Sequence, residues 1–375
     1  MDKKNNTPRK VLLNDEVLNL SVNVVEDMLG LNSASNAVYN DRTIICHILN
    51  ASVSKTSISN VSNLCDDAPC EGTIRYRLRN INLDGIQQSL NEKLKIHAKK
   101  TLPRKLDLAI DYTDIPYYGK EENDGDTIKT KPKNGTGRFY AYATIYVILN
   151  NKRYTLAVKY VRKGESLKDT VDFLIKEIED IRFKIKTLFL DREFYSVEMI
   201  NYLQNRKTSF IMPCVKKGPS GGIRNLLTGR KSYSTEYTMR SKESEATFQV
   251  NVIAKYSKGK YKRNGIKHFA YAVYNVDIPL KKTFNEYRKR FGIESSYRLM
   301  NQARTHTSTK KPELRLLYIG ISLLLTNIWI YIQWTYLSIP RQGGRQKVTW
   351  TFKTMLKQID RATEEKLGFN NKITL

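Results

Sequence analysis

The sequence KLDLAIDYTDIPYYG, from Lys105 to Gly119, begins with an apolar run that predicts a buried β-strand leading into Asp111. A second stretch, KIKTLFLDREFYS from Lys184 to Ser196, brings another apolar run to Asp191. A carboxylate at the C-terminal end of a buried strand is costly to desolvate unless it has a partner, and a metal ion is a common one. We therefore expect these two aspartates to meet at one edge of a sheet.

A third carboxylate lies in FNEYRKRFGIESSYRLMNQART, from Phe284 to Thr305. On one continuous helix a single polar stripe would hold Tyr287, Arg290, Glu294 and Asn301. A helix that opens near Ile293, after Gly292, would instead align Glu294, Arg298, Asn301 and Thr305. A solvated charged face is the alternative for such a basic stretch. Three carboxylates with only oxygen donors would suit Mg²⁺.

These stretches resemble the DDE transposases of prokaryotic insertion sequences, in the group with the signature Tyr-x2-Arg-x3-Glu-x6-Lys. The signature is met by Tyr287, Arg290 and Glu294, but Asn301 stands in place of the lysine. In the family that lysine holds a DNA phosphate, and Arg298 or Arg304 could substitute for it here. The runs LFLDREFYS and ESSYRLMNQARTHTSTKKPELRLLYIG are also similar to the family, so the resemblance spans about Lys105 to Leu337.

The resemblance implies an α/β fold, in which an RNase H-like catalytic core is interrupted by an all-β insertion and preceded by a helical domain. The predicted order of strand, β-hairpin, helix, strand, helix and strand agrees with such a core. The expected parts are a helical DNA-binding domain (1–100), the first part of the core (101–215), a basic β-rich insertion (216–280), the core with the glutamate and C-terminal helices (281–340), and a basic tail (341–375).

The resemblance also implies the chemistry. Asp111, Asp191 and Glu294 would be the catalytic residues and hold two Mg²⁺ ions, with Mn²⁺ as a substitute, and Asp111 would bridge the ions. Water would free a 3′ hydroxyl at the end of the element, and that hydroxyl would attack the target strand. Tyr287 and Arg290 would hold a DNA phosphate. Competing candidates for metal ligands are Asp107, Asp114 and Glu193.

The charge of the chain points to a polyanionic partner. The 375 residues include 64 Lys and Arg against 37 Asp and Glu, a net charge of +27. Nucleic acid is the first candidate and a membrane surface the second. The expected partners are double-stranded DNA, as transposon ends and target, and a second copy of the chain in a synaptic complex. In the β-rich insertion, contacts with the DNA phosphate backbone are expected from Lys258, Lys260, Lys262 and Arg263. A solvated hairpin without a partner is the alternative.

The N-terminal region reads as short helices: DRTIICHILNAS, TSISNVSNLC and, after the turn DDAP, CEGTIRYRLRNI. This pattern suits a helix-turn-helix whose last helix presents Arg75, Arg77 and Arg79 to DNA. An ordinary helical bundle with a basic face is the alternative. KLKIHAKKTLPRK, from Lys93 to Lys105, is interpreted as a basic linker.

Several features bear on location and on other functions. MDKKNNTPRK lacks the apolar core of a signal peptide. The resemblance to transposases of prokaryotic insertion sequences then implies a cytoplasmic, nucleoid-associated protein. The uncharged run from Leu316 to Pro340 is interpreted as a buried core helix, with a membrane span as the alternative. Cys46, Cys65 and Cys70 with His47 are poorly spaced for zinc. A nuclease for branched or hybrid nucleic acid and a catalytically dead DNA-binding protein are the competing functions.

Overall fold

The computed structural model describes residues 13–120, 125–149, 152–218, 220–257, 265–341, 344–346 and 350–369. Contacts divide the chain into two units. The first unit joins both ends of the chain and consists of Met1–Leu102, Pro116–Tyr140 and Ser296–Leu375. The second unit consists of Pro103–Ile115 and Ala141–Ser295. The strands β1 (Lys105–Pro116) and β3 (Thr136–Val147) contribute residues to both units.

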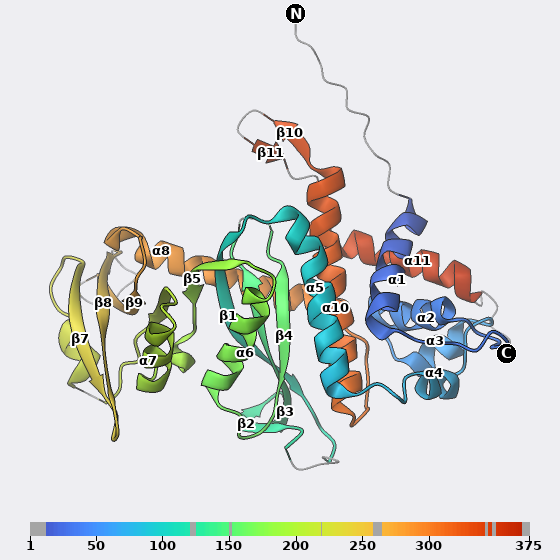
Figure 1. Cartoon of the computed structure of the whole chain (residues 1–375), viewed down its shortest axis with the longest axis horizontal. Coiled ribbons are helices and arrows are strands. Elements are labelled where there is room, and N and C mark those ends of the chain that lie inside the picture. Colours follow the sequence, from blue (N-terminus) through green and yellow to red (C-terminus); the bar gives the residue numbers. More distant parts are fainter. Residues whose placement is uncertain are drawn as a thin grey trace, which may run out of the picture. The chain divides into compact units, whose positions relative to one another are not determined.

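The N-terminal part of the first unit is helical (Figure 1). Its helices are α1 (Asn14–Leu29), α2 (Asp41–Val53), α3 (Ile58–Leu64), α4 (Glu71–Arg77) and α5 (Leu83–Thr101). Three of them begin at polar caps. The side chains of Asn40, Ser57 and Asn82 each accept a hydrogen bond from the backbone N–H of the residue three positions later. The short helices predicted from the sequence are therefore confirmed.

Helix α5 corrects one prediction. The segment Lys93–Lys105 was expected to be a linker, but the helix continues to Thr101. The apolar residues Ile86, Leu90, Leu94 and Ala98 recur every four positions and are buried along one face of the helix. They pack against α10 (Pro312–Ile332), so tertiary packing keeps this lysine-rich segment helical.

Helix α10 is the core of the first unit. The side chain of Asn327 donates to the carbonyl oxygen of Leu94 on α5 at 3.1 Å. Gly320 admits Leu90, since a Cβ on this glycine would lie 2.5 Å from Leu90 Cδ2. Within the described part of the chain, α10 and the turn after it form the one candidate membrane span, and 89% of its most apolar window is buried, as in a core helix.

The region predicted as a basic tail begins at the last residue of β10 (Ile339–Arg341) and contains β11 (Gly344–Gln346) and α11 (Phe352–Leu367). Helix α11 packs on α1 and α2 through a buried apolar face that includes Met355 and Ile359. The side chain of Asn50 donates to Thr363 Oγ1 at 3.0 Å. Residues 352–367 therefore belong to the helical core of the first unit.

The second unit contains a mixed sheet in the order β3-β1-β5-β6-β9-β8-β7, with β4 paired to β3. Its other strands are β4 (Thr155–Val161), β5 (Lys184–Phe189), β6 (Phe210–Pro213), β7 (Tyr233–Arg240), β8 (Glu245–Tyr256) and β9 (Ile266–Tyr274). Strands β1, β5 and β6 are parallel, whereas β6, β9, β8 and β7 are antiparallel in turn. The predicted α/β class is confirmed, and the three predicted basic strands extend the sheet through β9.

Two connections need comment. The polar segment between β1 and β3 contains a short strand, β2 (Ile128–Lys133), which pairs with the first residues of β3 in the first unit. The predicted hairpin turn at Asn150–Asn151 lies outside the described residues. Strands β3 and β4 are antiparallel on either side of it, as expected for a hairpin.

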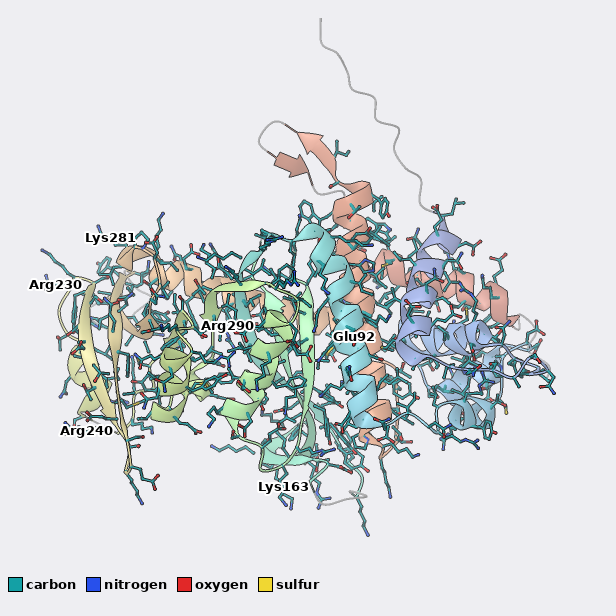
Figure 2. All side chains as sticks on the ribbon, in the orientation of Figure 1. Glu92, Lys163, Arg230, Arg240, Lys281 and Arg290 are labelled. Carbon is teal, nitrogen blue, oxygen red and sulfur yellow. The ribbon has the colours of Figure 1, made fainter. Side chains whose placement is uncertain are left out.

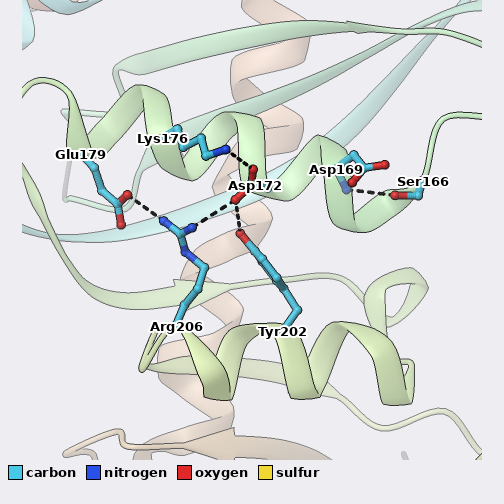
Figure 3. Close-up of polar contacts among 7 residues, drawn as sticks. All are labelled: Ser166, Asp169, Asp172, Lys176, Glu179, Tyr202 and Arg206. Atoms are coloured by element: carbon cyan, nitrogen blue, oxygen red, sulfur yellow. Dashed lines mark hydrogen bonds and ion pairs between the residues drawn. The ribbon is translucent and has the colours of Figure 1, made fainter. Parts of the chain in front are cut away.

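Helices α6 (Leu167–Glu179) and α7 (Val197–Asn205) are joined by a polar network in the second unit (Figure 3). The carboxylate of Asp172 on α6 accepts from the Tyr202 hydroxyl at 2.8 Å and from Arg206 at 3.1 Å. Lys176 lies 2.7 Å from the same carboxylate, and Arg206 also reaches Glu179 at 2.7 Å. This network fixes the two helices that flank β5 in the sequence.

Candidate active site

The two predicted aspartates come from neighbouring parallel strands. The paired register of β1 and β5 ends at Ala109 and Phe189, and each aspartate follows two residues later. Asp191 caps the 3₁₀ turn η1 (Arg192–Phe194), where its Oδ1 accepts from the Arg192 backbone N–H at 2.6 Å. Asp111 is not at a strand end, because β1 continues to Pro116.

Arg290 brings the two carboxylates together. Its Nη2 atom lies 2.8 Å from Asp111 Oδ1 and 3.6 Å from Asp191 Oδ2. The Arg290 side chain, labelled in Figure 2, is 4% exposed, whereas those of Asp111 and Asp191 are 21% and 37% exposed. One buried guanidinium therefore serves two carboxylates that are 80 residues apart in the sequence.

The electrostatics of this group show a need for positive charge. Burial raises the pKa of Asp111 to about 6, and the negative charge of Asp191 adds to the rise, although the Arg290 guanidinium lowers it. Burial opposes the charge of Arg290, but Tyr287, Asp111 and Asp191 outweigh it and raise the pKa of this arginine. The guanidinium therefore stays charged and partly compensates two carboxylates.

Tyr287 is buried next to the same strand end. Its hydroxyl donates to the carbonyl oxygen of Leu190 at 3.1 Å, and burial raises its pKa. Its ring lies 5.1 Å from that of Tyr271 and 6.5 Å from that of Phe189, measured between centroids. Tyr287 and Arg290 were predicted to contact DNA, and here both contact the protein around the aspartates. The contact of Arg290 with the aspartates was missed from the sequence. The available signal was that a desolvated carboxylate needs a positively charged partner.

Glu294 lies on a separate helix. The segment forms α8 (Thr283–Arg288), a 3₁₀ turn η4 (Lys289–Phe291) and α9 (Gly292–Met300), so the continuous helix is interrupted. Gly292 opens α9 beside Arg153, whose Cζ would lie 2.3 Å from an added Cβ. Glu294 is exposed, and no three His, Cys, Asp or Glu side chains among the described residues are grouped to hold a metal ion. The structure thus assembles two of the three carboxylates.

Helix α9 ends at Met300, which corrects the alternative stripe predicted for this segment. Asn301, Arg304 and Thr305 lie beyond the helix. The backbone N–H of His306 donates to the carbonyl oxygen of Thr56 at 2.9 Å, a contact that sequence periodicity does not reveal. Arg298 is exposed on α9, and Arg304 is half-buried.

The other predicted DNA contacts have different surroundings. Arg75 is exposed and paired with Glu71, and Arg77 is mostly buried and paired with Asp41. The guanidinium carbon of Arg79 lies 3.8 Å from the centroid of the Tyr76 ring. Four further predicted contacts are outside the described residues: Lys258, Lys260, Lys262 and Arg263.

Two competing candidates for metal binding have other partners. The carboxylate of Asp107 lies 3.5 Å from the Lys186 ammonium group. His47 Nε2 lies 2.9 Å from the Ile58 carbonyl oxygen.

Comparison with known proteins adds two findings. Residues 103–328, more than half of the chain, match a family described as the transposase DDE domain. A cryo-EM structure of a piggyBac transposase synaptic complex with hairpin DNA has a similar fold, with a TM-score of 0.58 at 11% sequence identity. The similarity covers 98% of this chain and 84% of that chain. No protein with a curated description matches.

Proposed function

Because the chain belongs to the DDE transposase family, whose members cut DNA and generally use divalent metal ions, we propose that it carries out cut-and-paste transposition of an insertion sequence. The observation that supports this most directly is the meeting of Asp111 and Asp191 at Arg290. Two partly desolvated carboxylates from adjacent parallel strands are a suitable base for a metal-dependent phosphodiester site.

The finer fold assignment is part of the proposal. The parallel strands β1, β5 and β6, with the antiparallel pair β3 and β4 beside β1, support an RNase H-like core. Strands β7 to β9 would then be the insertion between this core and the glutamate helix. The helices α3 and α4 would form the reader of the terminal inverted repeats.

Asp111, Asp191 and Glu294 would hold Mg²⁺, or Mn²⁺ in its place. The oxygen-only donors fit such ions, and the raised pKa of Asp111 indicates a carboxylate with too little positive charge around it. Bound ions would supply a nucleophilic water and stabilise the leaving oxygen. A movement of α9 would be needed to bring Glu294 to the aspartates.

The residues of the chain would share the work as follows. Tyr287 fixes the backbone before Asp191 through its bond to Leu190. Arg290 holds the two aspartates in place, and an ion bound between them would compete with it for their carboxylate oxygens. The freed N–H groups of Arg290 would then be available to a DNA phosphate, as bidentate donors.

The partners in this proposal are the terminal inverted repeats, a target DNA and a second copy of the chain in a synaptic complex. The net charge of +27 supports binding to DNA. The proposed location is the cytoplasm of a prokaryotic cell, in association with the nucleoid.

The proposal is tested with the full chain and DNA carrying the sequences that flank its own gene, in Mg²⁺. We expect cleavage at the ends by the wild type and at least a thousandfold loss in Asp191→Asn, a magnitude typical of lost catalytic groups. Asp107→Asn is the matched control, because this carboxylate lies on β1 beside Lys186. Calorimetric Mn²⁺ binding, weakened in Asp191→Asn and retained in Asp107→Asn, is the second measurement.

Other results would point elsewhere. Binding at the ends without cleavage by the wild type would indicate a DNA-binding protein that has lost its activity. Cleavage that ignores the end sequence would indicate a general nuclease. An equal loss of cleavage in Asp107→Asn would indicate that Asp107, rather than Asp111, is the metal ligand on β1.

A further inference from the structure

The first unit contains a polar groove away from the aspartates, with a volume of 510 Å³. It lies between the start of α3, helix α4, the segment 306–311 and the first turns of α10.

Positive charge dominates the groove. Four lining side chains are basic (Arg75, Arg79, Lys310 and Lys311), and one is acidic (Glu71). Glu71 is already paired with Arg75. Lys310 and Lys311 are exposed and form no ion pair with a described residue. The groove therefore offers cations that no acidic side chain in the described structure neutralises.

The groove also offers neutral donors. The hydroxyl oxygens of Ser57, Thr307 and Thr309 accept backbone N–H groups at 3.1–3.3 Å, so their own hydrogens remain available. Tyr318 is 5% exposed and lines the groove, and its hydroxyl makes no hydrogen bond with the described residues. This hydroxyl is not among the fully buried polar atoms of the described residues that lack a partner, so it is accessible from the groove and available as a donor.

The lysine-bearing segment is held in a fixed position. The Tyr140 hydroxyl donates to the Lys310 carbonyl oxygen at 2.8 Å, and Arg315 Nε donates to that of Thr309 at 2.6 Å. The guanidinium of Arg315 also lies 4.3 Å from the centroid of the Tyr140 ring. The backbone that carries the two lysines is therefore ordered before any ligand binds, which lowers the entropic cost of binding.

We propose that this groove binds the phosphodiester backbone of duplex DNA, as a second contact surface distinct from the aspartate site. Lysines and arginines neutralise phosphates, and hydroxyl groups donate to phosphate oxygens without reading bases. The choice of DNA as the polyanion rests on the proposed function. An acidic protein segment is the rival ligand.

The test measures binding of the full chain to a duplex of about 30 base pairs of arbitrary sequence by fluorescence anisotropy, in EDTA and over a range of salt concentrations. The variant Lys310→Gln/Lys311→Gln should bind about tenfold more weakly at 0.1 M salt, and the slope of log K against log salt should fall by about 1.8. Tyr318→Phe should weaken binding about threefold with an unchanged slope, since it removes a neutral donor.

The matched control is Lys353→Gln/Lys357→Gln, which removes the same charge from the exposed side of α11 in the same unit. Its slope should stay close to that of the wild type. Equal effects of the two double variants would show that only the overall charge matters and would overturn the proposal. Unchanged thermal unfolding in each variant excludes loss of folding as the cause.

EDTA separates this inference from the proposed function, because cleavage does not occur without metal ions. If the protein never cleaves the DNA ends but the variants differ in the slope of log K against log salt, the groove is supported and the transposase proposal is not. If the protein cleaves the DNA ends but the slopes do not differ, the transposase proposal is supported and the groove is not. If Lys310→Gln/Lys311→Gln lost binding to polyglutamate but still bound DNA like the wild type, the groove would be assigned to an acidic protein partner.

Discussion

Arg290 in the second unit and His97 in the first are both buried bases, with exposures of 4% and 6%, but their charge states differ. Arg290 lies beside two carboxylates, and its pKa is raised. His97 stacks on Tyr331 at 4.3 Å, and neither of its ring nitrogens has a hydrogen-bond partner among the described residues. Burial, with a smaller contribution from the charge of Lys100, lowers the pKa of His97 to about 4. The ordinary pKa of each base sets its charge at neutral pH, and its surroundings shift that pKa: the carboxylates raise the pKa of Arg290, whereas burial lowers that of His97.

The largest effect is expected for Arg290→Gln, which leaves the two aspartates without their counter-charge. The free energy of unfolding at pH 7 without divalent ions should fall by about 3 kcal/mol. Chemical denaturation measures this loss. The control is Arg288→Gln, because Arg288 is exposed and should contribute less than about 0.5 kcal/mol.

Adding Mg²⁺ sharpens the same experiment. If the aspartates are metal ligands, Mg²⁺ should restore more stability to Arg290→Gln than it adds to the wild type, because the ion meets no competing guanidinium. Equal costs for the two arginine variants would show that Arg290 is not the counter-charge of the aspartates.

A smaller, pH-dependent effect is expected for His97. Its pKa in the folded chain, about 4, lies below the ordinary value of 6.5, so the folded state favours the neutral ring. This stability is present above pH 6.5 and is lost as the pH falls toward 4. His97→Phe keeps an aromatic ring and does not titrate. Between pH 7 and 4 the wild type should lose about 2 kcal/mol more than the variant, measured by urea unfolding. Parallel pH profiles would mean that His97 is not kept neutral by burial.

The smallest effect is expected in the network of Figure 3, where a partly exposed carboxylate has several donors. Tyr202→Phe removes the hydroxyl that donates to Asp172 at 2.8 Å and should cost about 1 kcal/mol. Tyr256→Phe, at an exposed tyrosine, is the control. A double-mutant cycle with Asp172→Asn should assign the loss to this pair. A loss as large as that of Arg290→Gln would show that burial matters less than the number of partners.

The sequence predicted the local features of the fold well. Apolar runs located the strand β1, which contains Asp111, and the strand β5, which precedes Asp191. The parallel pairing of β1 and β5 then brought the aspartates close, although only Asp191 lies at a strand end. These features depend on periodicity and on the cost of burying charge, which a single sequence records.

The features that were missed depend on distant contacts. Lysines between 93 and 100 hid the four-residue apolar repeat of α5, which is stabilised by α10. Strand β2 is polar and forms only by pairing with β3. Helical spacing grouped Arg290 with Glu294 on one stripe, but it could not show that the guanidinium of Arg290 faces Asp111.

The assembly of the first unit from both ends of the chain has a consequence for folding during synthesis. Helices α2 and α5 pack against α11 and α10, which the ribosome makes last. The ends of α5 and α10 are 332 − 101 = 231 residues apart, and those of α2 and α11 are 367 − 53 = 314 residues apart. At about 5–20 residues per second, the apolar faces of the N-terminal helices therefore wait roughly 10 to 60 seconds for their partners. Chains that are cut short before α10 would retain these exposed faces and be recognised by chaperones and proteases. The architecture thus restricts a stable N-terminal region to chains whose synthesis has been completed.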